Sequence, residues 1–183
     1  AQYLGSNHKV KMQVTGPNGV TYTYNLSSAN EVFPFAAGNG AYNVGVFENV
    51  EGTSYAAVFN NTYDVTISDE FSPYLYPNQY VNFNSSSQVV ALASELALPA
   101  NDDLTVVTNV YNYMISNITY DYDKATSVAS GYIPVVDEIL VTKKGICFDF
   151  ASAMASMLRS QRIPTRLEIG YAGDAYHAWI STY

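Results

Sequence analysis

The chain has 183 residues, of which 48% are hydrophobic and 13% are charged, so its composition is that of a globular protein and not of a disordered one. Eight basic residues stand against sixteen acidic ones, and the net charge of −8 argues against binding to nucleic-acid phosphates. Two histidines and one cysteine exclude a zinc finger and an internal disulfide framework, and no apolar run is long enough to cross a bilayer.

The charged residues are unevenly spread. The 112 residues between Lys11 and Lys124 contain eleven acidic residues and no Lys or Arg, whereas the rest of the chain holds all eight bases and five acids. An alternating strand pattern also stops near residues 85–87. We therefore expect two units, a β-rich one over 1–87 and a second one over 88–183.

Residues 8–84 alternate between apolar and polar side chains, which is typical of half-buried strands. The expected strands are 10–14, 21–26, 42–50, 55–59 and 63–67. Turn-forming residues separate several of them, as in Gly16-Pro17-Asn18-Gly19. Five strands at this spacing predict a small Ig-like β-sandwich, and we expect it to be a binding or scaffold domain because nothing in it looks catalytic.

After residue 87 the apolar period becomes that of helices. Residues 89–97 predict a helix that Pro99 ends, and one of the residues 101–103 is expected to cap a second helix with an apolar stripe from Leu104 to Ile118. Further helices are expected at 135–141 and 146–161, followed by strands at 165–171 and 176–183. Helices followed by strands predict an α+β arrangement.

Cys147 lies at the expected start of the 146–161 helix, just after the flexible Gly145. The free N–H groups and the dipole at a helix N-terminus favour a thiolate, which is the nucleophilic form of cysteine. The backbone N–H of Cys147 is also a candidate to stabilise a developing oxyanion. The alternative is a buried structural cysteine, since free cysteines are often buried.

His177 follows Cys147 by thirty residues, in the sequence Tyr-His-Ala-Trp-Ile at 176–180. The chain between them contains a helix, a loop with Pro164, a strand and a turn at 172–174, a path that can return the backbone past the helix N-terminus. There an imidazole would take the thiol proton and later give it to the leaving group. The alternative is an ordinary core or surface histidine.

An ordered series of short blocks resembles the transglutaminase-like core. The blocks are Asn-Ile-Thr-Tyr-Asp at 117–121, Gly-Ile-Cys-Phe-Asp-Phe at 145–150, Met-Leu-Arg at 157–159, Ile-Pro-Thr-Arg at 163–166, Gly-Tyr at 170–171 and His-Ala-Trp at 177–179. The resemblance covers roughly residues 88–183. The first unit also resembles the β-rich units that precede such cores in secreted bacterial proteins.

The resemblance implies a papain-like fold with a Cys-His-Asp catalytic triad, in which Cys147 matches the nucleophile and His177 matches the base. The third member of the family's triad is an acid or amide on the strand after the histidine. Only Ser181 and Thr182 offer polar side chains between that histidine and Tyr183, so the third residue has no counterpart here. We expect the core to be truncated after the histidine strand, and a longer chain, another segment or another subunit to complete it.

The expected chemistry is acyl transfer from a peptide or side-chain amide through a thioester on Cys147. If water is the acyl acceptor, the protein is a cysteine peptidase or amidase, and if an amine is the acceptor, it is a transglutaminase. The sequence does not distinguish between these two acceptors. Analogy with bacterial members of the family favours hydrolysis. Residues Tyr120, Asp121, Tyr122 and Asp123 are candidates to line the cleft, and one of the two tyrosines is a candidate for a second oxyanion donor. The alternative function is a non-catalytic cell-surface module that binds glycan or protein and retains a degenerate or truncated core.

We expect a peptide or protein substrate, with cell-wall material as a further candidate. We expect no cofactor, no metal ion, no binding to nucleic acid and no membrane-spanning segment. The oligomeric state stays open. A start at Ala1-Gln2 is compatible with a removed signal peptide. Many Asn, Ser, Thr and Tyr residues with few Lys are typical of an extracellular bacterial protein. We therefore expect an extracellular or cell-surface location.

Overall fold

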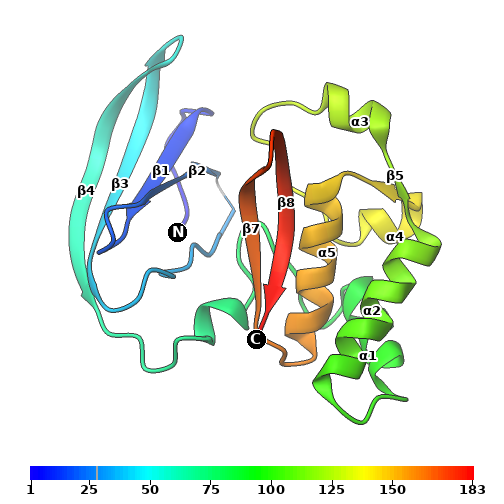
Figure 1. The fold of residues 1–183 in the computed structure, drawn as a ribbon. Helices are drawn as coiled ribbons and strands as arrows, with labels where there is room; N and C mark the ends of the chain where they lie inside the picture. Colours follow the sequence, from blue (N-terminus) through cyan, green and yellow to red (C-terminus); the bar gives the residue numbers. More distant parts are fainter. Residues whose placement is uncertain (28) are drawn as a thin grey trace. The chain divides into compact units, whose positions relative to one another are not determined.

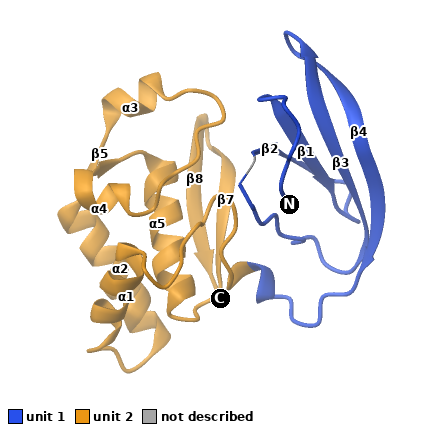
Figure 2. Ribbon diagram, turned by 180° about the vertical axis from the view of Figure 1, so that it is seen from behind, with its two compact units in different colours: residues 1–73 blue, residues 74–183 orange. Residues whose placement is uncertain are grey.

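The computed structural model describes residues 1–27 and 29–183, which Figure 1 shows as a ribbon. These residues divide into two compact units, 1–73 and 74–183 (Figure 2). The division lies earlier in the chain than the boundary expected after residue 87, because part of the intervening segment is packed in the second unit. Phe83, for example, packs against the hydrophobic cluster of that unit.

Unit 1 is built on one antiparallel sheet with the strand order β2-β1-β3-β4. The strands are β1 Val10–Thr15, β2 Thr21–Leu26, β3 Gly40–Glu51 and β4 Ser54–Val65, and a 3₁₀ turn, η1, follows at Ser72–Tyr74. The alternation predicted for the first strand is confirmed, since Val10, Met12 and Val14 are all buried. Their face of the sheet forms a cluster with the buried Tyr42 and with Phe33 and Phe35.

The described part of unit 1 forms a single sheet and not the two-sheet sandwich that we expected. Two of the five predicted strands, 55–59 and 63–67, belong largely to the one long strand β4. The chain stays extended between them because β4 remains paired with β3 through residues 59–63. The amide of Asn43 on β3 adds hydrogen bonds to the Asn60 Oδ1, at 2.7 Å, and to the Thr62 Oγ1, at 3.2 Å. The sheet is covered on one face by side chains from loops, and not by a second sheet.

Unit 2 contains helices followed by a hairpin, which confirms the predicted α+β class. Its elements are α1 Gln88–Ala97, α2 Asp103–Asn117, β5 Thr119–Tyr120, α3 Tyr122–Ser127, α4 Glu138–Thr142, β6 Lys144–Gly145, α5 Cys147–Ser160, β7 Thr165–Ala172 and β8 Ala175–Thr182. Asp102 caps α2, as one of three predicted candidates, because its carboxylate accepts the Thr105 N–H at 2.8 Å.

Helix α5 lies in the middle of unit 2, between α1 and α2 and the β7–β8 hairpin (Figure 1). Apart from Met154, every residue from Ala151 to Arg159 is buried. Alanines and serines supply five of these residues, which lets neighbouring elements approach the helix closely. Packing on several sides therefore fixes the helix and, with it, the position of its first residue, Cys147.

None of the described helices is both long and apolar enough to cross a membrane.

Candidate active site

Cys147 is the first residue of α5, as predicted, and its thiol is free and partly exposed. Ile146 precedes it in an extended conformation and has no side-chain acceptor to cap the helix. The first helical hydrogen bond joins the Phe150 N–H to the Ile146 carbonyl at 3.1 Å. The N–H of Cys147 therefore belongs to the group at the helix start that has no partner within the helix.

A short parallel pairing brings a distant segment alongside this helix start. In β5 and β6, Tyr120 lies opposite Gly145. The Thr119 N–H donates to the Lys143 carbonyl and the Asp121 N–H donates to the Gly145 carbonyl, each at 2.9 Å. The Asn-Ile-Thr-Tyr-Asp block at 117–121 therefore has a structural role, because its strand β5 pairs with the strand that leads into α5.

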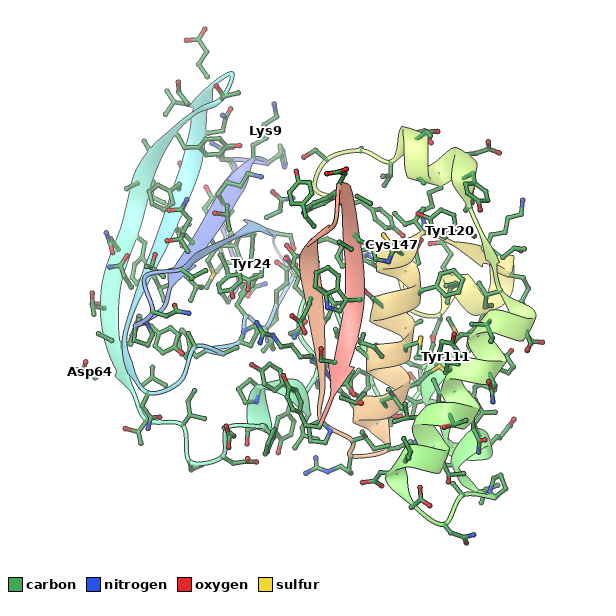
Figure 3. The ribbon with its side chains drawn as sticks, viewed as in Figure 1. Lys9, Tyr24, Asp64, Tyr111, Tyr120 and Cys147 are labelled. Carbon is green, nitrogen blue, oxygen red and sulfur yellow. The ribbon has the colours of Figure 1, made fainter. Side chains whose placement is uncertain are left out.

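Tyr120 consequently lies against Cys147 (Figure 3). Burial raises the pKa of the Tyr120 phenol, the charge and hydrogen bonding of the Cys147 side chain raise it further, and hydrogen bonding to the Cys147 backbone acts in the opposite direction. The phenol is thus in reach of both the backbone and the side chain of Cys147. The ring of Tyr122 packs on that of Tyr120, with centroids 5.0 Å apart. The role of either tyrosine as an oxyanion donor stays a prediction.

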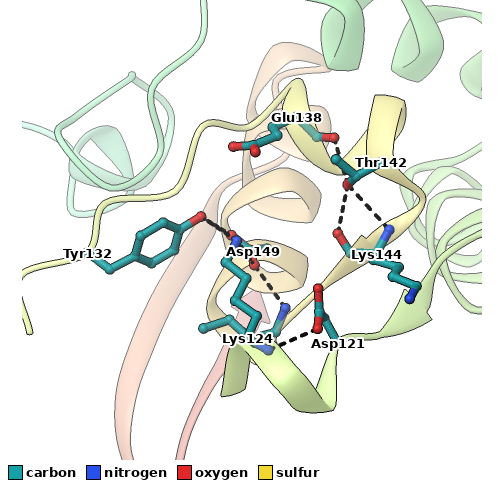
Figure 4. Close-up of polar contacts among 8 residues, drawn as sticks. Asp121, Lys124, Tyr132, Glu138, Thr142, Lys144 and Asp149 are labelled. Carbon is teal, nitrogen blue, oxygen red and sulfur yellow. Dashed lines mark hydrogen bonds and ion pairs between the residues drawn. The ribbon is translucent and has the colours of Figure 1, made fainter. Parts of the chain in front are cut away.

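A buried carboxylate holds the turn before Cys147 (Figure 4). Asp149 is only 5% exposed, and its Oδ2 accepts hydrogen bonds from the Ile146 N–H and from the Lys124 ammonium, both at 2.8 Å. Its Oδ1 accepts from the Tyr132 hydroxyl at 2.6 Å. The Lys124 ammonium also donates to the Tyr132 hydroxyl at 2.7 Å, so the three side chains form a closed cluster.

The sequence analysis did not single out Asp149, although a signal was present. An acidic residue at the third helical position, after a residue that has no capping side chain, is the helix half of a capping box. Here that half is made by Asp149 toward the N–H of Ile146. The pairing with Lys124, twenty-five residues earlier, has no local sequence signal.

His177 lies near the start of β8, opposite Gly170 of β7. Ala178 is buried and Ile180 packs against the helical cluster, so alternation puts His177 and Trp179 on the other face of the hairpin. The two rings are stacked, with centroids 6.5 Å apart. The start of β8 and the start of α5 lie at the same end of unit 2 (Figure 1). The side chain of His177 is exposed, and among the described residues no hydrogen bond joins it to Cys147.

The described residues contain no group of three or more His, Cys, Asp or Glu side chains arranged to hold a metal ion. The candidate site consists of the Cys147 thiol, the phenols of Tyr120 and Tyr132, and the ion pair of Lys124 with Asp149. The imidazole of His177 lies on β8.

The family model described as the transglutaminase-like superfamily matches residues 90–183, which is more than half of the chain. The chain belongs to the transglutaminase-like superfamily. The predicted family resemblance is thereby confirmed, and the matched segment contains both Cys147 and His177.

Two curated proteins share limited identity with the chain. It is 24% identical over 133 residues to the UPF0252 protein MJ1282 of Methanocaldococcus jannaschii, a match that covers 66% of the chain and 37% of that protein. It is 28% identical over 141 residues to the uncharacterized protein YebA of Bacillus subtilis, covering 65% of the chain and 19% of YebA. The chain thus spans well under half of the length of these curated relatives.

Among solved structures, the chain is similar to the "Putative Cysteine Protease" from Cytophaga hutchinsonii. The TM-score is 0.54 at 21% identity, and the match covers 100% of this chain and 64% of the other. At this level of identity the likeness shows a shared fold. The transglutaminase-like fold of unit 2 therefore has support from both sequence and structure.

Proposed function

We propose that this chain carries a thiol-dependent acyl-transfer site of the transglutaminase-like type, with Cys147 as the nucleophile and His177 as the general base. The observation that carries the proposal is that the only cysteine of the chain is the first residue of the buried central helix α5, within the segment that matches the family. A thiol in this position faces the positive end of the helix dipole, which favours the thiolate.

The reaction follows from the chemistry of the residues. The imidazole of His177 takes the thiol proton, and the Cys147 sulfur attacks an amide carbonyl to form a carbon–sulfur bond. The carbonyl oxygen becomes an oxyanion, for which the Cys147 N–H and the Tyr120 hydroxyl are the proposed donors. The carbon–nitrogen bond then breaks, the imidazolium protonates the leaving amine, and a thioester remains on Cys147.

The acceptor decides the outcome of the second half-reaction. Attack by water releases an acid and regenerates the thiol, which is the reaction of a peptidase or amidase. Attack by an amine gives a new amide, which is the reaction of a transglutaminase. We favour hydrolysis by analogy with the structurally similar protein named as a cysteine protease.

The catalytic pair needs His177 to reach the thiol. Hydrogen bonds between catalytic groups are often long or poorly aligned in free enzymes and shorten when substrate binds, so their absence in the free site does not decide against the pair. The support is the direction of β8, which begins at the same end of unit 2 as α5. The exposed His177 lies on the hairpin face opposite to Ala178 and Ile180, so the proposed pair requires its side chain to turn toward the thiol.

For unit 1 we propose a binding or scaffold role. A binding role requires exposed apolar side chains, and β4 offers Val58, Phe59 and Tyr63, each more than 40% exposed. An extracellular or cell-surface location is part of the same proposal and rests on the composition of the chain.

The test is the rate of iodoacetamide alkylation of Cys147 as a function of pH, measured by intact mass. We expect the midpoint for the wild type to lie below the ~8.5 of an ordinary thiol, and to rise in His177→Ala. His8→Ala is the matched control, because it removes the other histidine of the chain, in unit 1. Cys147→Ala should take up no label.

Turnover is tested in parallel with a glutamine-containing peptide, by ammonia release with and without an added primary amine. Loss of ammonia release in Cys147→Ala and His177→Ala, but not in His8→Ala, supports the pair. A normal midpoint that is the same in wild type and His177→Ala, together with no turnover of peptide amides, would overturn the proposal in favour of a binding module.

A further inference from the structure

The cluster around Asp149 lies beside the proposed nucleophile, and the reaction as written assigns it no role. We infer that Asp149 is a positioning residue for Cys147, and that Lys124 is the counter-charge that lets a carboxylate sit beside a thiolate. The inference rests on the proposed function only in taking Cys147 as the reactive group.

The first part of the inference follows from the hydrogen bonds. The Asp149 carboxylate accepts the N–H of Ile146, the residue directly before Cys147, and thereby closes the turn that carries the thiol. Ile146 cannot cap the helix with its own side chain, so this bond replaces the cap. The carboxylate accepts two further hydrogen bonds, from Lys124 on the same oxygen and from Tyr132 on the other. The carboxylate therefore has one fixed orientation.

The cluster also links the turn to the segment that carries Tyr120. The Asp121 side chain accepts the Lys124 N–H at 2.9 Å, and the Asp121 N–H donates to the Gly145 carbonyl at 2.9 Å. Lys124 is thus tied to the β5–β6 pairing through its backbone and to α5 through its ammonium. A change that removes the acceptor oxygens of Asp149 would release both sides of the site.

The second part of the inference concerns charge. A carboxylate in the first turn of α5 is stabilised by the same helix dipole that favours the thiolate, and it repels a negative charge on Cys147 two residues away. The Lys124 ammonium lies 2.8 Å from that carboxylate, on a side chain that is 27% exposed, and it offsets the repulsion. The site therefore contains a balanced ion pair next to the thiol.

Other titratable groups surround the same helix start and have to be considered together with the pair. From the neighbouring elements these groups are Tyr120, Asp121, Tyr132 and Lys144. Lys144 is exposed, so its charge is screened, and the ion pair between Lys124 and the buried Asp149 is expected to dominate.

The experiment measures the pH midpoint of Cys147 alkylation in Lys124→Met and Asp149→Asn, without any substrate. Removing the ammonium leaves an unbalanced carboxylate, so the midpoint should rise by roughly half a unit to one unit in Lys124→Met. Removing the negative charge leaves an unbalanced ammonium, so the midpoint should fall by a similar amount in Asp149→Asn. Opposite shifts are the signature, because a purely structural role would move both variants in the same direction.

Two further variants serve as controls. Lys144→Met removes an exposed lysine close to the same turn and should leave the midpoint within about 0.2 units of the wild type. Tyr132→Phe removes one hydrogen bond to Asp149 but keeps the ion pair, and should shift the midpoint less than Lys124→Met does. If Asp149→Asn fails to fold, the rise in Lys124→Met decides the question alone.

The result that overturns the inference is an unchanged midpoint in Lys124→Met, or shifts of equal sign in the two charge variants. These outcomes are independent of turnover. Opposite shifts in a protein that hydrolyses no peptide amide would uphold the inference while the proposed function fails. Turnover that depends on His177, with no shift in either charge variant, would do the reverse.

Discussion

A β-carbon on Gly145 would lie 2.8 Å from the β-carbon of Asp149, and equally close to the Ile139 Cδ1. Such distances are shorter than van der Waals contact, so only a glycine fits between the strand β6 and the first turn of α5. The close approach explains why a glycine precedes Cys147 by two residues in this chain. It also allows the Asp149 carboxylate to reach the N–H of Ile146.

The first prediction is that Gly145→Ala lowers the stability of unit 2 and also changes the alkylation rate of the Cys147 thiol. We expect a loss of about 1–3 kcal/mol in the free energy of unfolding, since the added methyl group forces Ile139 or the helix start to move. Urea denaturation measures the loss, and the alkylation rate of Cys147 reports the disturbance.

The matched control for this variant is Gly173→Ala, in the turn between β7 and β8. Gly173 has φ +63° and open space around it, so an alanine there meets backbone strain of about 1 kcal/mol without a clash. Its Cys147 alkylation should match that of the wild type. Equal alkylation rates in Gly145→Ala and the wild type would contradict the prediction.

Two buried serines on α5 provide a second prediction. Both Ser152 and Ser156 are fully buried, and the Ser156 hydroxyl donates to the Ser152 carbonyl at 2.8 Å. The Ser152 hydroxyl, in contrast, has no hydrogen-bond partner within the described residues. We expect Ser156→Ala to lose about 0.5–1.5 kcal/mol of unfolding free energy, and Ser152→Ala to be neutral or slightly stabilising. Thermal unfolding of the two variants side by side checks the difference, and a larger loss in Ser152→Ala would reverse our interpretation.

Arg159 gives a third prediction, because it is a buried cation held by carbonyl groups. It is 3% exposed, its Nε donates to the Thr165 carbonyl at 2.8 Å, and another of its nitrogens donates to the Tyr76 carbonyl at 2.7 Å. Burial lowers the pKa of the guanidinium to about 10. We expect Arg159→Met to lose about 2–4 kcal/mol, because two carbonyl groups lose a charged donor.

Arg159→Lys should recover only part of that loss, since an ammonium cannot reproduce two directed donors on a planar group. The exposed Arg162 offers the control, and Arg162→Met should stay within about 0.5 kcal/mol of the wild type. Chemical denaturation of the three variants measures these differences. Arg159→Met as stable as the wild type would mean that the cost of burying the charge equals the gain from its hydrogen bonds.

The sequence predicted the elements whose signal is local. The helix α5 and the β7–β8 hairpin were predicted within about two residues, because their apolar periods are regular and Pro164 separates them. The helix α3 and the pairing of β5 with β6 were not predicted. They are short, and the pairing joins residues 119–120 to residues 144–145, so no periodicity within either segment reveals it.

In the candidate site, too, the features with a local sequence signal were predicted and the long-range contacts were not. The position of Cys147 at a helix start was visible in the sequence, because an apolar helical period begins there after a glycine. The contacts of Asp149 with Lys124 and Tyr132 depend on how α3 and the following loop fold back over α5. The expected sandwich failed for a related reason: alternation identifies strands but does not show whether they pair in one sheet or in two.

The last prediction concerns stability at alkaline pH. Burial raises the pKa of the Tyr132 phenol from 10.0 to about 12, and the hydrogen bond to Asp149 contributes to the rise. Burial lowers the pKa of Lys124, but its hydrogen bonds to Asp149 and Tyr132 raise it overall. The folded protein therefore holds these protons more tightly than the unfolded chain does. Their contribution to stability is complete below pH 10 and is lost as the pH rises from 10 to about 12.

We expect the advantage of the wild type over Tyr132→Phe to shrink across this range, by an amount on the order of 1 kcal/mol because the phenol is partly solvated. Urea denaturation at pH 8, 9, 10 and 11 measures it, with Tyr171→Phe as the control because that hydroxyl lies on an exposed side chain. A difference between the wild type and Tyr132→Phe that is constant from pH 8 to 11 would show that the phenol does not retain its proton on folding. In that case the Asp149 cluster would be held by the Lys124 ion pair without a contribution from Tyr132.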